Sequence, residues 1–165
     1  MSKEIESVIE RYKGTLIGGA VGDALGQPLE FSDLGKGKVV AEMLDSPFAN
    51  WKKGEYTDDT DQTLLLVDSF VDKKGYDPDD FVKRLLKWFN HGNVKDIGST
   101  TTISLRLIER GMDRRKAGKI ALNLGAVPSN GSLMRTAPVG LFFRNKPELL
   151  YKAASEISSI THAAK

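Results

Sequence analysis

The sequence contains no cysteine, and this absence excludes two kinds of structure. A scaffold held together by disulfides and a metal site built on thiolates both require cysteine. The chain also lacks an apolar run of the ~20 residues that a membrane-spanning helix needs. Its first residues, Met1 to Glu4, include charged side chains and have no apolar core behind them, unlike a signal peptide. We therefore expect no disulfides, no membrane contact and a cytoplasmic location.

Charge of one sign is not in excess either. The 24 Lys and Arg residues nearly balance the 22 Asp and Glu residues, and no dense basic run occurs. This balance argues against a nucleic-acid partner. Hydrophobic residues make up 40% of the 165 residues and charged residues 28%, which is typical of a folded globular protein. No linker divides the sequence, so we expect a single domain over residues 1–165.

Apolar residues spaced as on helices dominate the sequence, and alternating strand patterns are scarce. The spacing predicts an all-α protein of about seven helices. The residues behind this prediction are Val8, Tyr12, Leu16 and Ala20 in a first helix, Leu65, Leu66 and Phe70 in a helix over 58–71, Phe81, Leu85, Trp88 and Phe89 after a start at Asp77 to Asp80, Ile103, Leu107 and Ile108 before Gly111, a helix over 114–124 before Gly125, and a last helix from Pro147. Residues 132–142 are a further candidate, in which Pro138 is expected to kink or break the helix.

The segment Thr57-Asp58-Asp59-Thr60-Asp61 places three acids and two hydroxyls at an expected helix start. Crowded oxygen ligands are what a hard cation such as magnesium requires. The alternative is a helix cap, in which Thr57 or Asp58 accepts a free backbone N–H and the other acids suit the helix dipole. Taken alone, the segment favours the cap. A cap needs only one such residue, however, and clustered like charges repel one another unless a cation or hydrogen bonds compensate.

A glycine-rich segment runs from Gly14 to Glu30. It is not a nucleotide-binding loop, because no strand precedes it and no Gly-Lys-Ser/Thr follows its glycines. Small residues spaced by four indicate close helix packing, with Gly22 or Gly26 at the helix end. Packing does not explain the acids Asp23 and Glu30 that flank this turn. We interpret them as candidates for a general base or a metal ligand.

Three other segments carry polar side chains in suggestive positions. Asp96 to Thr102 is another cluster of acid and hydroxyl groups, for which an N-cap is the favoured interpretation. Asn130-Gly131 marks a turn whose backbone N–H groups, if they enter a helix, offer a site for a phosphate. His162 follows Thr161 near the end of the sequence, where fraying weakens the case for a catalytic histidine.

Five motifs then follow one another in a fixed order. They are Gly-Asp-Ala-Leu-Gly at 22–26 followed by Glu30, Thr-Asp-Asp-Thr at 57–60, Asp-Ile-Gly-Ser-Thr-Thr at 96–101 after a helix with Trp88, Asn-Gly-Ser-Leu-Met-Arg at 130–135, and Thr-His at 161–162. In this order they resemble the ADP-ribosylglycohydrolase family. The resemblance implies an all-α domain that binds two magnesium ions, or manganese in their place. It implies metal ligands at Thr57, Asp58 and Asp59, catalytic acids at Glu30 and Asp96, and substrate contacts at Asn130, Gly131 and His162.

The implied reaction is hydrolysis of the bond between ADP-ribose and a modified protein side chain, with the ADP-ribosylated protein or ADP-ribose as partner. Two features depart from the family pattern. Ser129 stands where the family has glycine. Family members are also longer, and their second half supplies an Asp-x-Asp-Thr/Ser segment that this sequence lacks. The alternative hypothesis is therefore a non-catalytic, truncated or split fragment that needs a C-terminal partner half or self-associates.

Overall fold

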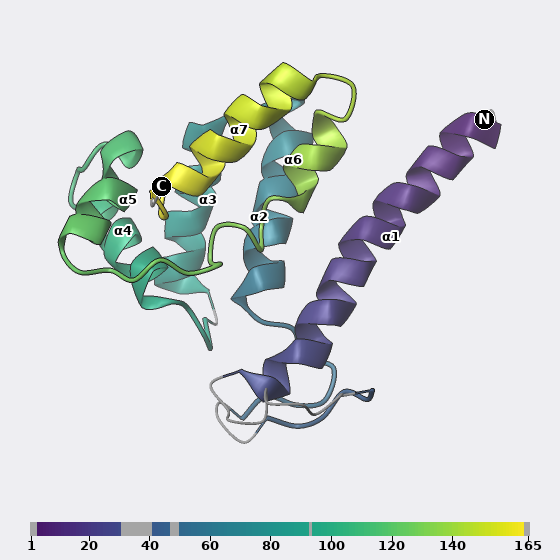
Figure 1. Cartoon of the computed structure of the whole chain (residues 1–165), viewed down its shortest axis with the longest axis horizontal. Helices are drawn as coiled ribbons and strands as arrows, with labels where there is room; N and C mark the ends of the chain where they lie inside the picture. The colour runs from purple at the N-terminus through teal and green to yellow at the C-terminus, as the bar shows by residue number, and fades with distance from the viewer. Residues whose placement is uncertain (1–2, 31–40, 47–49, 93, 164–165) are drawn as a thin grey trace. The chain divides into compact units, whose positions relative to one another are not determined.

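The computed structural model describes residues 3–30, 41–46, 50–92 and 94–163. These residues form helices and connecting turns, and they contain no strand, which confirms the predicted all-α fold (Figure 1). The chain divides into two units, Met1–Asp61 and Gln62–Lys165, with the boundary inside α2. The described elements are α1 (Lys3–Gly26), η1 (Gln27–Leu29), α2 (Asp58–Lys73), α3 (Pro78–His91), α4 (Ser99–Glu109), α5 (Arg114–Asn123), α6 (Ala137–Phe142) and α7 (Pro147–Ser159).

The first unit is built on the long helix α1. The residues predicted to lie on its apolar side, Val8, Tyr12, Leu16 and Ala20, are half-buried, and Ala24 continues the spacing as a buried residue. The helix ends at Gly26, one of the two predicted end points. Away from this side, α1 carries exposed apolar side chains, among them Ile17 at 61% exposure. No helix among the described residues combines the length and the apolar character that crossing a bilayer demands.

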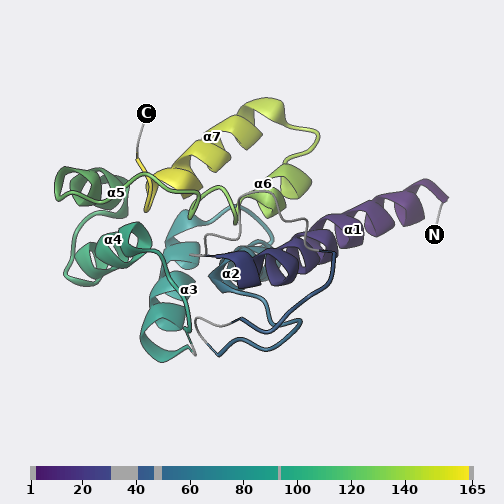
Figure 2. The same ribbon diagram turned by 60° about the horizontal axis from the view of Figure 1, so that its bottom comes forward.

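The second unit holds the main hydrophobic core. Here α4 packs against α3 and α5, and α7 packs against α5 and α6 (Figures 1 and 2). The predicted apolar sides of α2 and α3 supply much of this core. The buried cluster comprises Leu66, Phe70, Phe81, Val82, Leu85, Leu105, Val139, Phe143, Ala153, Ile157 and Ile160.

Two kinds of local signal fix the helix ends in this unit. At the start of α3, Asp77 accepts hydrogen bonds from the N–H groups of Asp79 (3.1 Å) and Asp80 (2.9 Å), as an N-cap does. After α4 and α5, Gly111 and Gly125 adopt φ angles of +91° and +93°, which glycine tolerates without steric cost. These starts and stops confirm the sequence prediction.

Three predictions about helices are corrected. The candidate helix over 132–142 is wrong in its first half, because residues 131–135 form turns and α6 begins only at Ala137. Pro138 lies in the first turn of α6, where its missing N–H costs nothing, so it starts a helix instead of kinking one. On α4, the expected apolar stripe of Ile103, Leu107 and Ile108 is only half-buried.

The buried side of α4 is mostly polar instead, and consists of Thr100, Thr101, Ser104 and Leu105. The reason is that its hydroxyls bind the main chain of facing segments. Thr100 Oγ1 donates to the carbonyl of Val127 at 2.6 Å, and Ser104 Oγ donates to the carbonyl of Thr161 at 3.0 Å. Where a helix packs against a segment without regular secondary structure, the buried carbonyls of that segment need hydrogen-bond donors. The spacing of apolar residues does not predict which helix side must supply these donors.

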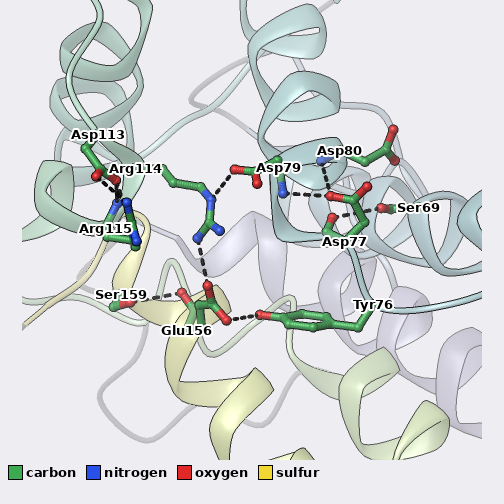
Figure 3. A network of polar contacts seen from close by, with 10 residues as sticks. All are labelled: Ser69, Tyr76, Asp77, Asp79, Asp80, Asp113, Arg114, Arg115, Glu156 and Ser159. Carbon is green, nitrogen blue, oxygen red and sulfur yellow. Dashed lines mark hydrogen bonds and ion pairs between the residues drawn. The ribbon is translucent and has the colours of Figure 1, made fainter.

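A network of charged groups joins α3, α5 and α7 (Figure 3). Arg114 on α5 donates to Asp79 on α3 and to Glu156 on α7, the latter at 2.9 Å. Tyr76 donates its phenolic hydrogen to the other oxygen of Glu156 at 2.8 Å. Burial, together with the Glu156 carboxylate, raises the pKa of Tyr76, so the tyrosine stays a donor. The network contains none of the predicted site residues, and we assign it a role in holding the helices together.

Candidate functional site

In the first unit, the carboxylate of Asp23 organises the first turn of α2. Its Oδ2 accepts hydrogen bonds from the N–H of Thr57 (3.0 Å), the N–H of Thr60 (3.1 Å) and the hydroxyl of Thr60 (2.6 Å). Its Oδ1 accepts from the hydroxyl of Thr57 at 2.8 Å. Free N–H groups at a helix start are normally satisfied by a residue next to them in sequence. Here an acid from the end of α1 does so.

The predicted cap at Thr57 is confirmed in a weaker form. Thr57 Oγ1 accepts a hydrogen bond from the N–H of Asp59 at 3.3 Å, while the same hydroxyl donates to Asp23. Thr57 and Asp58 are buried and Asp59 is half-buried. Asp23 was a candidate base or metal ligand on sequence grounds. Its four accepted hydrogen bonds make it a residue that positions the start of α2.

The same residues fit part of the coordination shell of a hard cation. The Thr57 hydroxyl gives its hydrogen to Asp23, so its oxygen offers lone pairs, and Asp58 and Asp59 add two carboxylates. Over residues 3–30, 41–46, 50–92 and 94–163, no three His, Asp or Glu side chains gather as a complete metal site would require. The segment therefore supplies some of the oxygens that magnesium needs.

The two acids expected to be catalytic lie in different units. Glu30 follows η1 and is exposed, and its N–H donates to the carbonyl of Gln27 at 3.1 Å. Asp96 is half-buried ahead of α4, and it makes no hydrogen bond or ion pair with another described residue. The side-chain N-cap favoured for this segment is wrong. Gly98 occupies the cap position of α4, and no side chain caps it.

In the second unit, a tight turn begins at Asn130 and continues through residues 131–135, as Asn130-Gly131 predicted. The carbonyl of Asn130 accepts hydrogen bonds from the N–H groups of Leu133 (2.7 Å) and Met134 (3.2 Å). The N–H groups of residues 129, 130, 131 and 132 donate to no acceptor within the described part of the chain. The turn does not enter a helix directly, contrary to expectation. Residues 129–132 still carry four consecutive open main-chain donors, and such donors suit an anion.

Gly131 and His162, both predicted to contact substrate, lie against each other. A Cβ on Gly131 would stand 2.9 Å from Cε1 of His162 and 3.1 Å from its Nε2. It would also approach Thr101 Oγ1 to 3.3 Å. Only glycine therefore lets the imidazole ring lie over the turn. This contact joins residues from two motifs that are far apart in the sequence.

His162 is not part of a frayed end, so that expectation is wrong. Its side chain is only 9% exposed, and both ring nitrogens have partners. Nδ1 lies 2.8 Å from Thr161 Oγ1, and Nε2 lies 2.9 Å from Ser129 Oγ. Burial, and after it the positive charge of Arg135, lower the pKa of His162 to about 4. The imidazole is therefore neutral near pH 7.

The sequence does not predict the structural role of Arg135. Its side chain is 0% exposed, and its guanidinium lies 5.6 Å from the ring centre of Phe81. It donates to Gln62 Oε1 (2.6 Å), to the carbonyl of Ile157 (3.1 Å) and to Thr161 Oγ1 (2.8 Å). A weaker bond of 3.3 Å reaches the carbonyl of Gly131. Arg135 therefore links the turn, α2 and the segment that carries His162.

Comparison with known proteins agrees with these motifs. The family model for ADP-ribosylglycohydrolase matches residues 4–165. The chain is 32% identical to the ADP-ribosylarginine hydrolase Tri1 of Pseudomonas putida, over 96% of the chain and 43% of that protein. It is 31% identical to the ADP-ribosyl-(dinitrogen reductase) glycohydrolase of Rhodospirillum rubrum, over 94% of the chain and 52% of that protein.

A solved structure is also similar. It is described as an ADP-ribosylglycohydrolase-related protein complex, with a TM-score of 0.75 and 34% identity, over 92% of the chain and 48% of the matched chain. The chain thus spans about half the length of the relatives it matches. The family model covers the sequence almost from end to end, and the fold agrees with it. This chain therefore belongs to the ADP-ribosylglycohydrolase family.

Proposed function

We propose that this protein takes part in magnesium-dependent hydrolysis of the glycosidic bond between ADP-ribose and a modified protein side chain. The observation that carries the proposal is the segment 129–132 at the start of the turn, whose four main-chain N–H groups find no acceptor in the described part of the chain. A row of fixed donors suits the diphosphate of ADP-ribose.

The metal is assigned to the first unit. Thr57, Asp58 and Asp59 would hold magnesium, or manganese in its place, and Asp23 fixes the hydroxyl of Thr57 for that purpose. A magnesium ion bound there would polarise water and substrate oxygens. The residues fit this role because they combine two carboxylates with an oriented hydroxyl at the positive end of a helix.

The remaining step is removal of a proton from the attacking water. In glycoside hydrolysis a carboxylate performs this step while the transition state gains oxocarbenium character. Asp96 suits the role, because it is half-buried and pairs with no other described residue. Glu30 is the second candidate, on the strength of its place after the Gly-Asp-Ala-Leu-Gly motif.

The alternative is a non-catalytic fragment that needs a C-terminal partner half or that self-associates. Two observations support it. Asp58 and Asp59 bring only two negative charges towards the four positive charges of two magnesium ions. In addition, α1 leaves Ile5, Ile17 and Val21 exposed, and exposed apolar side chains favour association. On this view, the missing ligands and the cover for α1 both come from a second half.

Metal binding is tested by titrating magnesium, then manganese, into the chain in a calorimeter. We expect weak binding, because magnesium keeps several waters and only part of the ligand set is present. Asp58→Asn combined with Asp59→Asn should abolish it, since this double substitution removes both carboxylates. Asp68→Asn, an exposed acid on the same helix, is the matched control and should leave binding unchanged. Unaltered binding in the double variant would leave the segment as a helix cap alone.

A further inference from the structure

A chain of hydrogen bonds runs from the buried Arg135 through Thr161 and His162 to the exposed Ser129. It begins with Arg135 Nη2, which donates to Thr161 Oγ1 at 2.8 Å. A guanidinium can only donate, so Thr161 accepts in this bond. Thr161 is fully buried, and the only other hydrogen-bond partner of its hydroxyl among the described residues is His162 Nδ1 at 2.8 Å.

This arrangement decides which ring nitrogen of His162 carries the proton. The hydroxyl hydrogen of Thr161 has one available acceptor, and that acceptor is Nδ1. If Nδ1 carried a proton instead, the buried hydroxyl hydrogen would have no partner, and an unmet buried donor is costly. Nδ1 is therefore the acceptor. A neutral imidazole with a bare Nδ1 carries its hydrogen on Nε2.

The tautomer of His162 determines the direction of its hydrogen bond with the exposed Ser129. Nε2 lies 2.9 Å from Ser129 Oγ, so the Nε2–H donates and the serine oxygen accepts. The hydroxyl hydrogen of Ser129 is then left to donate elsewhere. Ser129 is exposed, and it makes no other hydrogen bond within the described part of the chain. Ser129 is also the first of the four consecutive residues whose main-chain N–H groups are open.

We propose that Arg135 and Thr161 hold His162 as the Nε2–H tautomer, and that His162 thereby directs the Ser129 hydroxyl to donate to the diphosphate of ADP-ribose. This inference rests on the proposed function. Ser129 is the substrate-contacting residue, whereas Thr161 and His162 are positioning residues. The Ser129 hydroxyl is held by the imidazole and adds a donor to the row.

The tautomer is measured by nitrogen-15 NMR of the imidazole groups near pH 7. The chain has two histidines, so His91→Gln removes the other signal and identifies His162. We expect a proton on Nε2 and none on Nδ1. A proton on Nδ1, or on both nitrogens, overturns the inference whatever the chain binds.

The ligand is tested by calorimetry with ADP-ribose and with ADP, which keeps the diphosphate. Ser129→Ala should weaken binding of both by about three- to tenfold, the effect of one lost hydrogen bond. Ser129→Thr retains a hydroxyl and should restore most of the affinity. Ser155→Ala, an exposed serine on α7, is the control and should have no effect.

The binding results distinguish an error in the role of Ser129 from a failure of the proposed function. If the unaltered chain binds ADP-ribose and Ser129→Ala binds it equally well, the role of Ser129 is wrong while the proposed function stands. If only ADP-ribose and not ADP responds to the substitution, the diphosphate is the wrong acceptor. If the unaltered chain binds neither ligand, the proposed function fails and the ligand for Ser129 fails with it.

Discussion

Replacing Arg135 by alanine is expected to lower the free energy of unfolding of the second unit by about 3 to 5 kcal/mol. The guanidinium is fully buried, so its loss leaves a cavity in the core. It also removes the hydrogen bonds that Arg135 donates to Gln62 Oε1 and to the carbonyl of Ile157. Domains are only marginally stable, so a loss of this size removes much of the total.

The measurement is urea unfolding, followed by the fluorescence of Trp88 in a Trp51→Phe background so that the second unit alone is reported. Arg110→Ala removes an exposed arginine at the end of α4 and is the matched control, with an expected change of less than about 0.5 kcal/mol. Arg135→Lys keeps the charge with fewer donors and should fall between the two. A stability within about 1 kcal/mol of the unaltered chain would contradict the structural role of Arg135.

Replacing Asp23 by alanine is expected to act on both stability and metal binding. The first turn of α2 would lose the carboxylate that accepts from the N–H groups of Thr57 and Thr60, and loss of a helix cap costs up to about 2 kcal/mol. The Thr57 hydroxyl would lose its orienting partner as well. Removal of an orienting partner of a metal ligand typically weakens affinity by about 10- to 100-fold.

Circular dichroism on heating and a magnesium titration measure these two effects on the same sample. Asp23→Asn keeps one carbonyl oxygen as acceptor and should lose less than Asp23→Ala in both measurements. Glu10→Ala, an exposed acid on α1, is the control. If Asp23→Ala unfolds and binds magnesium as the unaltered chain does, Asp23 does not position the start of α2.

The local features of the fold were predictable because local chemistry determines them. Apolar spacing identified the buried sides of α2 and α3, including Leu66 and Phe81, since a helix places such residues on one side. Gly111 and Gly125 marked helix ends because each adopts a positive φ angle. The sequence does not predict the polar buried side of α4, because its hydroxyls donate hydrogen bonds to carbonyls of segments that are distant in the sequence.

Sequence motifs predict which residues belong to the candidate site, but they do not predict which of these residues contact one another. The motifs named Thr57, Gly131 and His162, but no spacing rule brings Asp23 to the start of α2 or the His162 ring onto Gly131. Arg135 shows the same limit. An arginine is seldom fully buried, so the sequence favours a surface role, and only the folded chain shows four acceptors gathered around it.

Because this chain supplies only a few metal ligands, we expect it to be a poor enzyme by itself. Thr57, Asp58 and Asp59 offer oxygens to one part of a metal shell, and two magnesium ions side by side repel each other unless more carboxylates surround them. Loss of one ion should remove several kcal/mol of transition-state stabilisation. At about 1.4 kcal/mol for each tenfold change, this corresponds to a rate lower by about a thousandfold or more.

The most direct test measures release of ADP-ribose from proteins modified on arginine and on serine. The chain is assayed alone and together with a separately expressed C-terminal half of a longer family member that carries the Asp-x-Asp-Thr/Ser segment, each with magnesium and with a chelator. We predict little or no release by the chain alone, release on mixing, and loss of that release when magnesium is removed. Full release by the chain alone would contradict the expectation that its metal site is incomplete, and undiminished release without magnesium would contradict the proposed function.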